Sequence, residues 1–367
     1  MFAVTLYSSL FALALSASGV LAQDPPSSTY PAVPLAQKRF DSPDSLPEKV
    51  DTDVGLIRGT QKGYNKCDKT TEGQDSLCQT MYFNSIDDFC LWAPPETGKE
   101  VGSIEGEMVA WCTKPGHGTR LIPAGALKGV QWMKTPDYVQ AVGFLDQTLL
   151  NMTPDDFGGE MDPHGADLRG NPMGGVVFSN AYNGKYQQAV EWHNFIGSNA
   201  FCFKACDPNG PNAAHFCEHV FDRIGCAYNA PNNAQKDVFE SCQGENQDFP
   251  GVYTVDGKAV TYTQPPESLG AISTMPYTAR VPQSSSCVTY TSSVLYAAAP
   301  TVSTSAAATT TAATSSGSKA STTSKSTAAA TTSGAAGSST SAGNGASIVA
   351  MSGVSLFGIV FAALFFA

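Results

Sequence analysis

Apolar residues gather at the two ends of the chain and recur in short runs between them. The first 22 residues, MFAVTLYSSLFALALSASGVLA, are mostly apolar or small, and the last 20, from Ile348 to Ala367, contain no charged side chain. Interior runs such as DFCLWAPP, EMVAWCTKP and GVQWMKTPDYVQAVGFLDQTLL are rich in aromatic and β-branched residues and are interrupted by Pro and Gly. Such runs predict β-strands. We therefore expect a mainly β globular domain over residues 50–290, a sandwich or irregular barrel with short helices.

Two segments show helical spacing instead, near residues 213–224 and, more weakly, near 234–241. In the first, NAAHFCEHVFDRIGC, Asn212 can cap the N-terminus and Gly225 stands where a glycine commonly ends a helix. The apolar side chains of this helix would share one buried face. They are Phe216, Cys217, Val220, Phe221 and Ile224.

The terminal apolar segments have the features of export and anchoring signals. Small residues ending at Ala22 fit a cleavage site, so residues 1–22 are predicted to be a signal peptide. At the other end, small residues, a spacer and a hydrophobic tail over 346–367 are typical of a GPI-attachment signal, with Asn344 as the predicted attachment site and Gly343 as the second choice. The alternatives are an uncut N-terminal anchor and a tail that inserts as a helix.

Two further segments are predicted to lack a globular fold. Residues 301–345 consist mostly of Ser, Thr, Ala and Gly, which favours a disordered, O-glycosylated stalk over a bare flexible linker. Residues 23–49 are rich in Pro and Ser and are predicted to be disordered. They contain the dibasic pair Lys38-Arg39, and cleavage there would make Phe40 the first residue.

Charge and cysteine content narrow the class of protein. A net charge of −11 argues against binding to nucleic acid or to an anionic membrane surface. An even number of cysteines in a secreted chain predicts disulfides, here up to five, although the sequence does not fix their pairing. We expect pairing mostly within the two groups in which the cysteines occur: Cys67, Cys78, Cys90 and Cys112, then Cys202, Cys206, Cys217, Cys226, Cys242 and Cys287.

The stretch HFCEH, residues 215–219, matches the inverted zinc-protease motif H-x-x-E-H. A catalytic zinc site also needs a third protein ligand, and no later glutamate stands in a convincing helical frame. On the predicted helix the two histidines lie on the polar face, opposite the apolar one. We therefore predict no metal site and no cofactor, and keep His215 and His219 only as weak metal-ligand candidates.

A polar loop over residues 153–175 is the candidate binding site. It brings acidic residues together with a histidine among Gly and Pro, and could bind calcium or sugar hydroxyls, although its spacing does not match a calcium loop. A solvated polar loop is the alternative. Convergence of the histidine with two of the carboxylates on one cleft would favour an enzyme or metal site. The candidates are Asp155, Asp156, Asp162, His164 and Asp167.

Other chemistry has weaker support. No G-x-S-x-G nucleophile motif is present, and no cysteine can be assigned as a free nucleophile. Asn151-Met-Thr153 is the standard acceptor for N-glycosylation, although Pro154 follows it. The four tryptophans are expected in the core of the β domain rather than on a sugar-stacking surface.

Several stretches carry a resemblance to a known family. FCFKACDPNGPNAAHFCEHVFDRIGCAYNAP, ESCQGENQDFPGVYT and GHGTRLIPAGALKGVQWMKTPDYVQ resemble the secreted macrophage-activating glycoproteins of basidiomycete fungi, over about residues 50–290. The resemblance implies a fungal cell-surface or wall glycoprotein, and it brings no catalytic residues.

These observations predict a GPI-anchored fungal glycoprotein at the outer face of the plasma membrane or in the cell wall. Its expected role is structural, adhesive or glycan-binding, with cell-wall polysaccharide as the candidate partner and the GPI lipid as its link to the membrane. The alternative is a secreted enzyme acting on extracellular polysaccharide.

Overall fold

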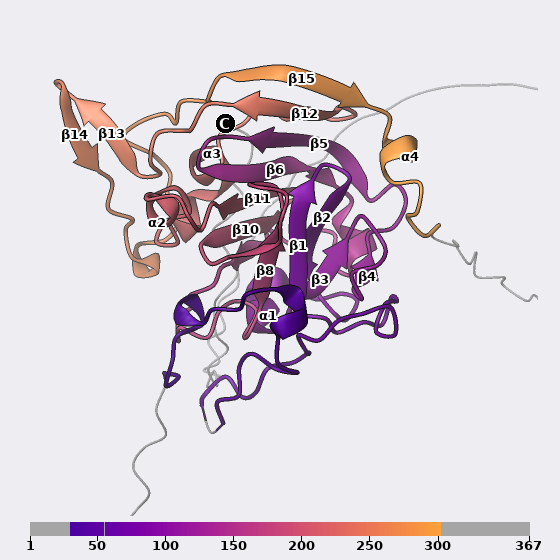
Figure 1. The fold of residues 1–367 in the computed structure, drawn as a ribbon. Helices are drawn as coiled ribbons and strands as arrows, with labels where there is room; N and C mark the ends of the chain where they lie inside the picture. Colours follow the sequence, from indigo (N-terminus) through magenta and orange to yellow (C-terminus); the bar gives the residue numbers. More distant parts are fainter. Residues whose placement is uncertain (1–29, 55, 302–367) are drawn as a thin grey trace, which may run out of the picture. The chain divides into compact units, whose positions relative to one another are not determined.

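The computed structural model describes residues 30–54 and 56–301 (Figure 1). Up to Pro300, these residues belong to one compact unit, so the two groups of cysteines share one body. The predicted signal peptide, stalk, GPI-attachment site at Asn344 and hydrophobic tail lie outside the described residues. No helix of the described part is long and apolar enough to span a membrane.

The first large sheet has six strands in the order β4-β3-β2-β1-β8-β9. The β1–β8 and β3–β4 pairs are parallel, and the other pairs are antiparallel. Its strands are β1 (Thr80–Ser85), β2 (Asp88–Ala93), β3 (Val109–Cys112), β4 (Arg120–Leu121), β8 (Val176–Ser179) and β9 (Gln187–Ala189).

The second large sheet has seven strands in the order β15-β12-β5-β6-β11-β10-β7, with β12 and β5 parallel. A separate two-stranded hairpin, β13 (Val252–Val255) with β14 (Lys258–Thr261), projects from it in Figure 1. The seven strands are β5 (Leu127–Lys134), β6 (Tyr138–Leu145), β7 (Gly159–Met161), β10 (Trp192–Gly197), β11 (Ala200–Cys206), β12 (Phe239–Gly244) and β15 (Ser284–Tyr290).

Helices are short throughout the described part, and they lie before β1, in the connections between strands, or after β15 (Figure 1). The α-helices are α1 (Val101–Ile104), α2 (Ala213–Phe216), α3 (Gly225–Asn229) and α4 (Ser292–Leu295). The 3-10 helices are η1 (Leu35–Gln37), η2 (Pro43–Ser45), η3 (Glu105–Glu107), η4 (Gln147–Leu150), η5 (Asp222–Ile224) and η6 (Glu267–Leu269). The predicted fold class, mainly β with short helices and stapled by disulfides, is confirmed.

An aromatic core joins the two large sheets face to face. The ring of Phe83 on β1 lies 4.7 Å from that of Trp132 on β5 and 4.4 Å from that of Phe203 on β11. The Phe89 ring on β2 lies 6.1 Å from the Phe201 ring on β11. All four tryptophans are buried, as expected. Burial of such large side chains supplies most of the favourable free energy of folding.

Strand β11 uses its two faces differently because side chains alternate along a strand. Phe201 and Phe203 point into the core between the sheets. Cys202, Lys204 and Cys206 point the other way, toward residues 213–229, which we call the α2–α3 segment. This second face is held to the segment covalently and by hydrogen bonds, as described below.

Five disulfides form, each within one of the two groups of cysteines. Two of them fasten the α2–α3 segment to β11, and Cys90–Cys112 crosses from β2 to β3. The pairs are Cys67–Cys78, Cys90–Cys112, Cys202–Cys226, Cys206–Cys217 and Cys242–Cys287.

The continuous helix predicted over residues 213–224 is wrong. α2 ends at Phe216, and a break precedes η5 and α3. Val220, expected to be buried, is 52% exposed, whereas the charged Arg223 is 3% exposed. The disulfides at Cys217 and Cys226 hold the α2–α3 segment on β11 at two points, and this constraint overrides the local helical spacing.

The weaker helix near residues 234–241 is also wrong, because Phe239–Gly244 forms strand β12, paired in parallel with β5. Residues 30–49 likewise differ from the disordered segment that the sequence suggested. Leu35 and Leu46 are buried in the core, and the Phe40 N–H donates to Gln188 Oε1 at 2.8 Å. Cleavage after Arg39 remains a prediction.

Candidate functional site

The acidic loop predicted as a binding site is folded back on the domain, and most of its carboxylates are used structurally. Asp156 accepts hydrogen bonds from two main-chain N–H groups, each at 2.8 Å. Asp167 is paired with Arg58 at 2.5 Å, and Asp155 is exposed. These three carboxylates therefore do not converge with His164 on one cleft, and the loop does not splay into solvent either.

A different set of side chains meets His164. Its Nε2 lies 3.2 Å from Glu191 Oε2, and its ring stacks on the ring of His219, with centroids 3.6 Å apart and planes within 8°. The three residues come from the loop after β7, the position before β10 and the link between α2 and η5. We call them the histidine–glutamate cluster.

The backbone and a disulfide bring this cluster together. The Cys206 N–H donates to the Glu191 carbonyl at 3.0 Å, at the end of the β10–β11 pair. Cys206 is bonded to Cys217, which precedes His219 by two residues. The disulfide therefore holds the α2–η5 link next to the start of β10, and His219 next to Glu191.

Buried carboxylates adjoin the cluster. Glu160 and Asp162 are two residues apart on extended chain, so their side chains point the same way. Asp162 Oδ1 accepts a hydrogen bond from the His164 main-chain N–H at 2.6 Å. Glu105 accepts hydrogen bonds from the Glu160 N–H at 3.2 Å and from Asn171 Nδ2 at 3.0 Å. Oε1 of Glu160, a residue 5% exposed, has no hydrogen-bond partner among the described residues.

This environment shifts several pKa values. Burial, reinforced by the charge of Asp162, raises the pKa of Glu105 to about 8, and burial raises the pKa values of Glu160 and Asp162 as well. Burial alone would lower the pKa of His164, but the hydrogen bond to Glu191 together with the negative charges of Glu191, Asp162 and Glu218 outweighs burial and raises it. Burial and the charge of His164 lower the pKa of His219. The stacked histidine pair therefore favours one proton over two.

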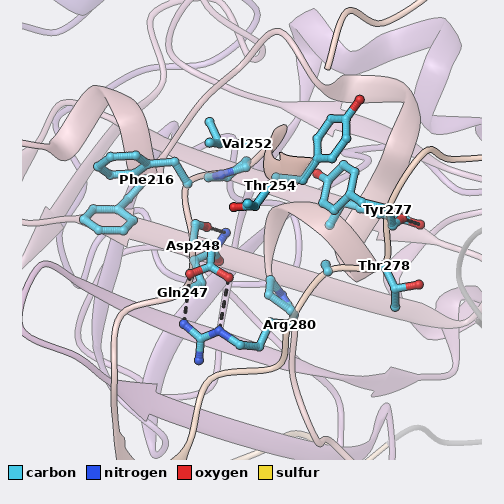
Figure 2. A pocket seen from close by; sticks show the side chains of 14 residues that line it. Phe216, Gln247, Asp248, Val252, Thr254, Tyr277, Thr278 and Arg280 are labelled. Carbon is cyan, nitrogen blue, oxygen red and sulfur yellow. Dashed lines mark hydrogen bonds and ion pairs between the residues drawn. The ribbon is translucent and has the colours of Figure 1, made fainter. Parts of the chain in front are cut away.

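A second candidate site is a pocket of about 590 Å³ beside the β13–β14 hairpin (Figure 2). The rings of Tyr253 and Tyr277 stack with centroids 4.8 Å apart and planes within 1°. Tyr228 meets Tyr277 edge-on at 5.2 Å. All three rings line the pocket, and we call them the tyrosine row.

Hydrogen-bonding groups lie beside the tyrosine row. Arg280 donates from Nε to Asp248 Oδ2 at 3.1 Å and from a terminal nitrogen to Asp248 Oδ1 at 3.0 Å, as the dashed lines in Figure 2 mark. Both side chains are exposed, so they keep capacity for further hydrogen bonds. Thr254 and Thr278 add two hydroxyl groups to the lining. Flat rings next to such groups suit a ligand with an apolar face and a polar rim.

The hairpin that carries Tyr253 is set by its turn. Asp256 and Gly257, between β13 and β14, have φ angles of +50° and +76°. Two consecutive residues with positive φ are typical of the tight hairpin turn that Asp-Gly favours, because glycine adopts this conformation without steric cost. The turn fixes the register in which Tyr253 faces Val260 on the neighbouring strand.

The H-x-x-E-H motif does not form the zinc site that this sequence pattern forms in zinc proteases. α2 ends before His219, so the helical relation between its two histidines is lost. His215 is exposed and lies near the Phe249 ring, with centroids 5.2 Å apart, while His219 stacks on His164. Asn151, the predicted glycosylation acceptor, is partly buried and hydrogen-bonded to the Pro94 carbonyl, and its glycosylation remains a prediction.

Sequence reasoning missed Glu191 and the tyrosine row. Glu191 belongs to no motif and reaches the histidines only through strand pairing and a disulfide. The hairpin did carry a signal, because Asp256-Gly257 between two alternating runs is a strong local indication of a two-residue turn. The tyrosines themselves are far apart in the sequence, so no local pattern joins them.

The fold and these two sites define a disulfide-stapled, β-rich protein with a histidine–glutamate cluster and an aromatic pocket. Comparison with curated proteins then shows its family. The chain is 43% identical to the Appressorium protein ROW2 of Mycosarcoma maydis over 216 residues, which cover 58% of this chain and 72% of that protein. It therefore belongs to the family of this fungal appressorium protein, and the fungal part of the predicted resemblance is confirmed.

A second relative extends the comparison. The Appressorium protein ROW1 of Mycosarcoma maydis is 48% identical over 197 residues, which cover 53% of this chain but 46% of ROW1. No protein-family model matches the chain, and no solved structure matches it. The likeness to macrophage-activating glycoproteins remains a prediction.

Proposed function

We propose that this protein is a fungal cell-surface glycoprotein that binds cell-wall polysaccharide through the tyrosine row. The observation that carries the proposal is the stack of Tyr253 and Tyr277 beside the exposed Arg280–Asp248 pair. A sugar ring has a face of C–H groups and an edge of hydroxyl groups. Aromatic rings match the first, and the charged pair with its neighbouring hydroxyl groups matches the second.

The family membership supports the cellular setting of this proposal. The relatives are named for the appressorium, a fungal infection structure. Five disulfides fit an oxidising compartment such as the secretory pathway and the cell exterior. A surface protein in this setting meets wall polysaccharide as its most abundant neighbour.

Binding can be tested on a panel of insoluble polysaccharides. The disulfide-bonded protein, secreted from a fungal host, is expected to be retained on at least one of chitin, β-glucan and mannan and to be released by soluble fragments of that polymer. The amount bound is measured by depletion from solution. Retention on none of the three polymers would contradict the proposal of polysaccharide binding and would leave a structural or adhesive role.

The anchoring proposal is that residues 1–22 direct export, residues 301–345 form a glycosylated stalk, and Asn344 receives a GPI lipid. Phosphatidylinositol-specific phospholipase is then expected to release the protein from fungal membranes into the soluble fraction, measured by immunoblotting. An Asn344→Gln, Gly343→Gln double variant is expected to lose this phospholipase-releasable form. Unchanged behaviour of the double variant would contradict attachment at this site.

A further inference from the structure

We propose that His164, Glu191 and His219 bind one divalent transition-metal ion of the zinc class. None of these three residues lines the polysaccharide pocket. The site also differs from an H-x-x-E-H zinc site, because it takes only His219 from that motif. Two imidazoles and one carboxylate are a donor set that zinc and related ions commonly bind.

The separations between donor atoms are close to those that an ion needs. One ligand atom from each of the three residues can be chosen so that all lie within 4.8 Å of one another. Two ligands of a tetrahedral zinc ion lie roughly 3.3 Å apart, given Zn–N and Zn–O lengths of about 2.0–2.2 Å. The His164 Nε2 to Glu191 Oε2 separation of 3.2 Å already meets this value. The His219 ring, stacked parallel to that of His164, completes the set by turning about its Cβ–Cγ bond so that one nitrogen faces the ion.

Several carboxylates of the described part lie around the cluster. Asp162 and Glu218, like Glu191, lie close enough to both histidines to act on them electrostatically. Glu160 in turn lies close enough to Asp162 and Glu218 to interact with them. Oε1 of Glu160 is buried without a hydrogen-bond partner in the described part, on the side of the strand that Asp162 shares. An unpartnered buried carboxylate is costly, and a nearby dication offsets that cost.

Access and rigidity fit an ion that exchanges with solvent. The side chains of His164 and Glu191 are about one-fifth exposed, and that of His219 about one-third. Glu218, bonded in sequence to His219, lines an adjoining pocket of about 740 Å³, which offers a path for entry. The Cys206–Cys217 disulfide fixes two of the three elements before any ion arrives. Three protein ligands leave a coordination position for water.

The other grouping of potential ligands in the described residues carries no such site. It consists of Glu240, Cys242 and Cys287. Both of its cysteine sulfurs are bonded to each other in a disulfide, so neither is free as a thiolate.

The test uses the full secreted chain without a polyhistidine tag, stripped with EDTA, loaded with zinc and dialysed. His219→Asn and Glu191→Gln each remove one ligand, and His215→Asn, at the exposed histidine four residues away, is the matched control. Wild type and His215→Asn are expected to retain close to one zinc per chain by mass spectrometry of the metal. The two ligand variants are expected to bind zinc at least about tenfold more weakly in calorimetric titration.

A second readout separates binding from misfolding. All four proteins are expected to unfold at similar temperatures in EDTA, and added zinc should raise the midpoint only for wild type and His215→Asn. Cobalt loading of wild type should give the visible absorption bands of a four-coordinate ion. The proposal is overturned if folded wild type retains no zinc, or if the ligand variants retain as much as His215→Asn does.

Discussion

Replacing Lys204 with methionine is expected to lower the free energy of unfolding by about 3–5 kcal/mol, because buried acceptors lose their donor. Lys204 lies on β11 with no exposed surface, and its Nζ donates to the carbonyls of Phe216 and Asn229 and to Gln247 Oε1. It also lies 4.7 Å from the centre of the Tyr138 ring. Methionine keeps the apolar stem of the side chain but supplies no donor to these oxygens.

The change should be visible as a drop of roughly 10 °C in the midpoint of thermal unfolding. Lys185→Met, at an exposed lysine of the β8–β9 connection, is the matched control and should leave the midpoint within about 1–2 °C of wild type. The α2–α3 segment should also become easier to cleave with protease, because the hydrogen bonds from Lys204 to the carbonyls of Phe216 and Asn229 hold this segment on β11. An unfolding midpoint equal to that of the control would show that Lys204 does not hold the segment.

The second large effect concerns pH. Because the pKa of Glu105 rises from its ordinary value of 4.5 to about 8 in the folded protein, the stability linked to its neutral form is complete below pH 4.5. That stability is lost as the pH rises toward 8, because Glu105 ionises in the unfolded chain over this range while it stays protonated in the folded protein. Glu105→Gln removes this dependence, and between pH 4.5 and 8 the variant should gain up to roughly 4–5 kcal/mol relative to wild type.

The measurement is urea unfolding of both proteins at the two pH values, in EDTA so that bound metal plays no part. The comparison uses the change with pH, because the amide nitrogen that Glu105→Gln introduces cannot accept the Asn171 hydrogen bond and adds a constant offset. Glu267→Gln, at an exposed position, should shift the same comparison by less than about 1 kcal/mol. A constant difference between the Glu105 variant and wild type would mean that folding does not raise the pKa of Glu105.

Much of the β architecture follows from local sequence. The run DFCLWAPP contains β2, and GVQWMKTPDYVQAVGFLDQTLL covers most of β5 and all of β6, because β-branched and aromatic residues between turn signals favour extended chain. The core positions of the tryptophans follow in the same way. Local sequence also indicated two clusters of cysteines, and every disulfide stays within its cluster.

The failures come from constraints that act between distant parts of the chain. Residues 213–224 have helical spacing, but two disulfides to β11 break the helix, and residues 239–244 become a strand because β5 offers a partner. The Cys206–Cys217 disulfide and strand pairing also build the histidine–glutamate cluster. The β13–β14 hairpin and ring stacking between distant residues build the tyrosine row. The members of both sets are separated by tens of residues and carry no shared motif, so only the folded chain reveals them.

The most direct test of polysaccharide binding is a depletion isotherm on the polymer that retains wild type, measured for wild type, Tyr253→Ala and Tyr290→Ala. Tyr290 is an exposed tyrosine on β15, outside the pocket, and serves as the control. Loss of one face of the tyrosine row is expected to weaken binding about tenfold for Tyr253→Ala, with wild-type binding for Tyr290→Ala and unchanged unfolding midpoints. Equal isotherms for all three proteins would contradict polysaccharide binding at this pocket.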